Sequence, residues 1–67
     1  MVASIDIYRS AKALIERHGD AAGIIAARRA DELLARGDMD GKLTWLAILR
    51  AIEELNRTER DRSEAVN

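Results

Sequence analysis

The chain has 67 residues, which suits one small domain whose core alone stabilises it only marginally. Hydrophobic residues make up 48% and charged residues 34%, a composition typical of a globular chain and not of a disordered one. The net charge of −1 gives no reason to expect a polyanionic partner, and the absence of cysteine excludes disulfides, thiolate metal sites and cysteine nucleophiles.

Targeting signals are not visible in the sequence. The opening stretch MVASIDIYRS lacks the basic segment and the long apolar run of a signal peptide. No apolar stretch approaches the length of about 20 residues that a membrane span needs. The cysteine-free composition fits a reducing compartment. We therefore expect a soluble, cytoplasmic protein with no membrane contact.

The residue types predict an all-α fold. Ala, Leu, Arg and Glu dominate the chain, and proline is absent. Alternating runs of β-branched and aromatic residues, which would indicate strands, are missing. The expected architecture has three helices joined by two tight Gly-Asp turns, and the C-terminal helix is the longest.

The first helix is predicted over residues 4–18. Ser4 is its candidate N-cap, and Asp6 complements the positive end of the helix dipole. One face carries apolar side chains at helical spacing and ends in the only histidine; its members are Ile7, Ala11, Leu14, Ile15 and His18.

A Gly-Asp pair separates the first helix from the second, which is predicted over residues 21–36. We expect Gly19 to adopt the left-handed conformation just past the helix end, and Asp20 to cap the next helix. One side of the second helix carries mostly small side chains, namely Ala22, Gly23, Ala26, Ala27, Ala30, Leu33 and Leu34. Small side chains allow a neighbouring helix to approach closely.

The same device recurs at Gly37 and Asp38, before a third helix predicted from residue 39 to residue 56 or beyond. The segment GDAAG that begins at Gly19 matches GDMDG at Gly37. We interpret the match as two helix-ending turns of similar sequence that arose independently, with an internal duplication as the alternative. Residues 1–56 form the expected domain, and the charged residues 57–67 form a helical extension or a frayed tail.

The third helix has more apolar residues than one face can hold. Trp45, Ile48, Leu49, Ile52 and Leu55 share one broad face at about 100° per residue. Leu43 and Leu46 fall outside it, on the side of the charged residues; burial of both under the first helix in a different register is the alternative. Large apolar side chains off the main face are expected at a subunit interface. The candidate interface residues are Leu43, Trp45, Leu46, Ile24 and Ile25, and the expected assembly is a dimeric helical bundle.

Two familiar strings overlap at Asp38, and neither indicates a site. Arg36-Gly37-Asp38 spells an integrin-binding tripeptide, but it lies between helical segments instead of in an extended loop. Counted from Asp38, a calcium loop needs oxygen ligands where the chain has Lys42 and Leu49. A cap and a first-turn charge explain Asp38 and Asp40.

The sequence predicts no catalytic, metal-binding or cofactor-binding residue. His18 has no second histidine and no cysteine with which to share a metal, and no nucleophile and base occur in a recognisable arrangement. The chain is expected to be a non-enzymatic interaction module that acts as a homodimer, with an unidentified protein partner as a further option. A small DNA-binding regulator is the alternative, although Asp38 and Asp40 would repel phosphates at the start of its recognition helix.

The order of three segments resembles a family of short, uncharacterised proteobacterial proteins. The segments are IYRSAKALIERHGDAA, ARRADELLARGDMDG and WLAILRAIEEL, and the resemblance extends roughly from Asp6 to Leu55. The family shares the Gly-Asp turn and a final helix that starts near a tryptophan; Lys42, Leu43 and Thr44 before Trp45 depart from its pattern. The resemblance implies an all-helical bacterial protein of the cytoplasm and no assigned activity.

Overall fold

The chain is helical almost throughout. The computed structural model describes residues 4–65, and the side chains of residues 4–62. The elements are α1 (Ser4–His18), the short 3-10 helix η1 (Gly19–Ala21), α2 (Ala22–Ala35) and α3 (Met39–Ala65). Within the described range, only residues 36–38 lie outside a helix. The all-α prediction is confirmed.

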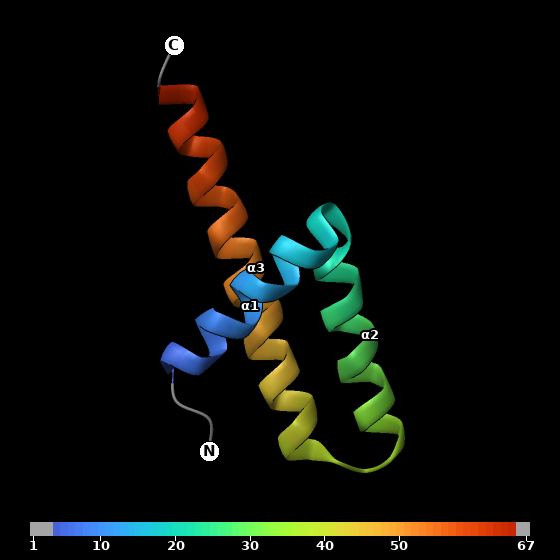
Figure 1. Cartoon of the computed structure of the whole chain (residues 1–67). Helices are drawn as coiled ribbons and strands as arrows, with labels where there is room; N and C mark the ends of the chain where they lie inside the picture. The colour runs from blue at the N-terminus through green and yellow to red at the C-terminus, as the bar shows by residue number, and fades with distance from the viewer. Residues whose placement is uncertain (1–3, 66–67) are drawn as a thin grey trace.

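The helices form an antiparallel α2–α3 hairpin that α1 crosses (Figure 1). α3 has 27 residues, a length of about 40 Å at the helical rise of about 1.5 Å per residue. Its C-terminal part extends beyond the other helices (Figure 1). The helix continues without a break to Ala65, so residues 57–65 are helical, and the predicted fraying at Val66 and Asn67 lies outside the described residues.

The shape is elongated. The principal extents are 47 × 22 × 16 Å and the radius of gyration is 13.0 Å. A compact domain of this length has a radius of gyration of about 11 Å. The difference arises because α3 is nearly as long as the whole molecule, whereas α1 and α2 cover only part of it.

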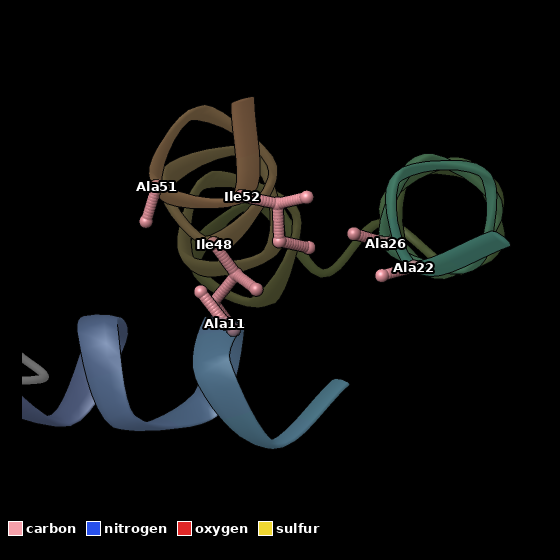
Figure 2. Close-up of a cluster of buried hydrophobic side chains, with 6 residues drawn as sticks. All are labelled: Ala11, Ala22, Ala26, Ile48, Ala51 and Ile52. Atoms are coloured by element: carbon pink, nitrogen blue, oxygen red, sulfur yellow. The ribbon is translucent and has the colours of Figure 1, made fainter. Parts of the chain in front are cut away.

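The core consists mostly of alanine. Figure 2 shows the buried cluster, made of Ala11 from α1, Ala22 and Ala26 from α2, and Ile48, Ala51 and Ile52 from α3. Ile52 is 1% exposed and is the largest fully buried side chain among the described residues. Half-buried apolar side chains surround the cluster: Ile7, Leu14, Ile15, Trp45, Leu49 and Leu55. Ala22, Ala26 and Ala30 of the predicted small-residue side are buried, whereas Leu34, also predicted there, is exposed.

Both predicted glycine turns have the expected backbone conformation. Gly19 has φ 56° and Gly37 has φ 79°, in the left-handed region that favours glycine. After α2, the N–H of Asp38 donates to the carbonyl of Leu33 at 2.9 Å, and the N–H of Gly37 donates to that of Leu34 at 3.0 Å. These two bonds form a Schellman motif, which satisfies carbonyls left free at the helix end.

The prediction that Asp20 caps the second helix is wrong. Asp20 lies inside η1, the N-cap position of α2 is Ala21, and no side chain makes the capping hydrogen bond. The N–H of Ala22 donates instead to the carbonyl of Gly19. Because the 3-10 turn leads directly from α1 into α2, the backbone satisfies a donor that a carboxylate would otherwise satisfy.

Asp38 caps α3 as predicted. Its Oδ1 accepts a hydrogen bond of 2.9 Å from the N–H of Gly41, and its carbonyl accepts one of 3.0 Å from Lys42. A Cβ built on Gly41 would lie 2.7 Å from Asp38 Oδ2 and 3.0 Å from Leu33 Cδ1. Gly41 is therefore required for the close approach of the cap, and the matching Gly23 has a different environment.

We predict opposite effects for alanine at these two glycines. Gly23→Ala removes a helix-disfavouring residue, and its Cβ would lie 3.6 Å from Leu49 Cδ1, so we expect a gain of up to about 1 kcal/mol in the free energy of unfolding. Gly41→Ala displaces the cap, with an expected loss of about 1 kcal/mol. Urea unfolding at equal protein concentration measures both. A Gly41→Ala variant as stable as Gly23→Ala contradicts the cap geometry.

A second prediction tests the close packing of α2 on α3. Ala26 is 0% exposed, so the larger side chain of Ala26→Leu must separate the helices, at an expected cost of about 1–3 kcal/mol. Ala35→Leu on the same helix is the matched control, because Ala35 is exposed and its substitution changes stability by about 0.5 kcal/mol or less. Equal thermal midpoints for the two variants would contradict the packing.

Candidate interaction surface

Large hydrophobic side chains are exposed on every α-helix. They are Ile5 and Tyr8 on α1, Ile24 and Leu34 on α2, and Met39 and Leu43 on α3. Single exposed apolar residues are normal on protein surfaces, whereas contiguous ones indicate binding. The informative question is which of them lie together.

Met39, Leu43 and Leu46 form an apolar ridge on α3. Their i, i+4, i+7 spacing confines them to a sector of about 60° around the helix axis. Met39 is 49% exposed, Leu43 is 57% exposed and Leu46 is half-buried. Leu43 lies about 180° from the buried Ile52. This set, called the α3 ridge below, faces away from the core.

Neither α1 nor α2 covers the α3 ridge. α2 approaches α3 where Gly23 lies beside Leu49, and α1 approaches where the Tyr8 hydroxyl donates to Glu54. Figure 2 shows the same arrangement: α1 and α2 meet α3 on two neighbouring sides, with Ile48 and Ile52 turned toward them. The ridge occupies the remaining sector of α3; further along the same sector, Arg50 lines the cleft beside Tyr8 of α1.

The same sector changes from apolar to charged along α3. After Leu46, the positions at helical spacing are Arg50, Glu53 and Arg57, all exposed. The ridge is therefore a short apolar segment in the N-terminal half of the helix. The charged half continues past the end of the core, where Figure 1 shows α3 projecting alone.

The structure separates the five predicted interface residues. Leu43 and Leu46 lie on the α3 ridge, whereas Trp45 is half-buried and packs against the core. Ile24 is 62% exposed but lies about 160° around α2 from the buried Ala26, on the outer side of the helix. Ile25 is half-buried on the flank of α2, where it shares a surface recess with Arg28, Arg29 and Glu32.

Sequence reasoning missed Met39 as a member of this surface. Its signal was present, because Met39 precedes Leu43 by four positions. Asp38 caps α3, so the helix begins at Met39. The Met39 side chain therefore lies on the same side of α3 as Leu43, four residues later.

A polar contact joins α1 to α3. The Tyr8 hydroxyl donates a 2.6 Å hydrogen bond to Glu54 Oε2. The hydrogen bond and the negative charge of Glu54 raise the pKa of Tyr8 above its usual value, with desolvation as a smaller contribution. A cleft of about 130 Å³ beside this contact is also lined by Arg50. Ligand pockets usually measure about 300 Å³ or more, so the contact is best explained as structural.

The other chemistry-bearing residues do not form a site within the described part of the chain. His18 is exposed at the end of α1, and no three His, Asp or Glu side chains gather as metal ligands among the described residues. Arg29 lies 3.8 Å from Glu32 on the surface of α2, and Asp38 and Asp40 occupy the start of α3. These charges of both signs add no support to the DNA-binding alternative.

Comparison with known proteins leaves the chain without a match. No protein-family model, no curated protein and no solved structure matches it. The resemblance to short proteobacterial proteins therefore stays a prediction. Along the described residues, none of the helices combines the length and apolarity required to cross a membrane.

The Tyr8–Glu54 contact predicts a loss of stability at high pH. Because folding raises the pKa of Tyr8, the contact stabilises the fold fully below the unfolded value of about 10 and ceases to do so as pH rises through the folded value. Tyr8→Phe is expected to be less stable than wild type at pH 8, with the difference vanishing at high pH. Urea unfolding across pH 8–11.5 measures it. A constant difference would contradict the contact.

Proposed function

We propose that the protein is a small non-enzymatic interaction module whose working unit is a homodimer formed through the α3 ridge. The observation that carries the proposal is the exposure of Leu43 beside Met39 and Leu46, on a helix face that neither α1 nor α2 covers. The proposal includes a dimeric helical bundle as the assembled form and a cytoplasmic location, which the cysteine-free composition supports.

The exposed area of the monomer supports self-association. The chain exposes 5229 Å², whereas a compact monomer of 7.4 kDa exposes about 4,200 Å². The excess of about 1,000 Å² is comparable to the area that each partner buries in a stable interface, about 600–1,000 Å². The elongated shape, in which α3 projects beyond the other helices, contributes to this excess (Figure 1).

The composition of the core supports the same proposal. Four of the six residues in the buried cluster are alanines, which contribute little apolar area each. Small domains with limited cores usually need a disulfide, a metal or a second chain. The cysteine-free sequence excludes the disulfide, and the described residues contain no group of metal ligands. A second copy provides the missing burial.

The ridge is also suited to a twofold interface. Most small homo-oligomers are twofold dimers in which the same patch meets itself. An apolar ridge is complementary to itself, whereas a patch of one charge would repel its copy. With a net charge of −1, long-range repulsion between two copies is small.

Light scattering coupled to size-exclusion chromatography tests the proposal. We expect a dimer for the wild type at micromolar concentration. Leu43→Glu places two carboxylates at the interface. It also removes the stabilisation of about 1.5–3 kcal/mol that burial of one leucine side chain contributes in each copy, so the dissociation constant is expected to rise at least about 100-fold. The helical circular dichroism of the variant is expected to persist, because Leu43 lies outside the core.

The matched control is Ile24→Glu, which places the same charge at a residue of similar exposure on the outer side of α2. This variant is expected to remain dimeric. A monomeric wild type removes the proposal, and a dimer that Ile24→Glu disrupts but Leu43→Glu does not would move the interface from α3 to α2.

A further inference from the structure

We infer that two copies pair their α3 helices antiparallel, about a twofold axis between Lys42 and Leu43, so that the charged halves of α3 project from opposite ends of the dimer. The inference rests on the proposed function and specifies the partner and its orientation on the α3 ridge. Three properties of α3 carry it: the shortness of the ridge, the position of its centre and the charges that follow it.

The apolar ridge is short, and only one antiparallel register matches it with itself. With the twofold axis between Lys42 and Leu43, Met39 of one copy lies level with Leu46 of the other, and the two Leu43 side chains meet because they are offset by only about 1.5 Å along the helices. A register centred further along α3, near Ile48, would place Leu46 opposite Arg50 and Leu43 opposite Glu53 of the second copy. That register desolvates charged groups against leucine, which is unfavourable.

The charges on the same face disfavour a parallel pair. In a parallel arrangement each residue lies beside its own copy, so Arg50, Glu53 and Arg57 would each face an identical charge. Like charges at such positions are destabilising. In the antiparallel pair centred beside Leu43, the start of the partner helix lies level with Leu46, so Arg50, Glu53 and Arg57 lie beyond that helix end and face no identical charge.

The length of α3 fixes where these charged halves lie. Arg57 lies about 21 Å beyond Leu43 along the helix, so the two Arg57 residues of an antiparallel dimer are about 42 Å apart. In a parallel dimer they are neighbours. The position of Arg57 therefore discriminates between the two orientations, whereas Leu43 lies at the interface in both.

Single cysteines provide the test, because the chain has none of its own. Leu43→Cys and Arg57→Cys are prepared separately in the full chain and treated with a short bis-maleimide. We expect the covalent dimer to form efficiently for Leu43→Cys and at background level for Arg57→Cys. Circular dichroism checks that both variants remain helical.

A mixture of Met39→Cys with Leu46→Cys tests the register independently. The mixed chains are expected to crosslink at least several times more efficiently than either variant alone, because position 39 of one copy faces position 46 of the other. This experiment retains Leu43, so it does not depend on the tolerance of the central position.

The outcomes separate the orientation from the proposed function. Efficient crosslinking of Arg57→Cys indicates a parallel pair and overturns the inference. A dimer by light scattering that crosslinks at neither Leu43→Cys nor the mixed pair overturns the register while leaving self-association intact. Monomeric behaviour of the wild type overturns both.

Discussion

The packing of the alanine side of α2 against α3 is the constraint on which the rest of the structure depends. Ala22 and Ala26 are fully buried beside Ile48 and Ile52, and their small side chains bring the two helices close together. A close hairpin needs a tight connection, which the Schellman motif at Gly37 and the Asp38 cap supply. The same packing turns one side of α3 toward α2 and so determines which side remains for other contacts.

Close packing through alanine side chains leaves the core with little buried apolar area. Each alanine removes little apolar area from water, and Ile48 and Ile52 are the only buried side chains of the cluster that are larger. α1 adds a third contribution by crossing α3, where Ala11 lies beside Ile48 (Figure 2). The Tyr8 hydroxyl also donates a hydrogen bond to Glu54 there. The resulting fold leaves Met39 and Leu43 in solvent. A core of this kind accounts physically for the proposal of a second copy.

The two Gly-Asp turns show how one sequence device produces two structures. Both glycines take positive φ, as the short segments GDAAG and GDMDG predict. After Gly37, Asp38 precedes a helix whose first N–H groups are free. Its carboxylate caps α3 by accepting a hydrogen bond from the N–H of Gly41. After Gly19, the chain enters a 3-10 turn whose own carbonyl bonds Ala22, so Asp20 has no capping role. The difference follows from the connection after each glycine: the 3-10 turn leads directly into α2, whereas non-helical residues 36–38 separate α2 from α3.

The sequence by itself determined the helical class, the boundaries of α1 and the start of α3, because periodicity, helix propensity and glycine punctuation act over a few residues. It also placed Leu43 off the core side of α3, since 3.6 residues per turn fixes the relative direction of side chains on one helix. Relations between helices were decided only by the tertiary structure. It placed α1 and α2 on two sides of α3, left Met39 and Leu43 exposed and separated Ile24 from the ridge, because these features depend on which sides of α3 the other helices cover.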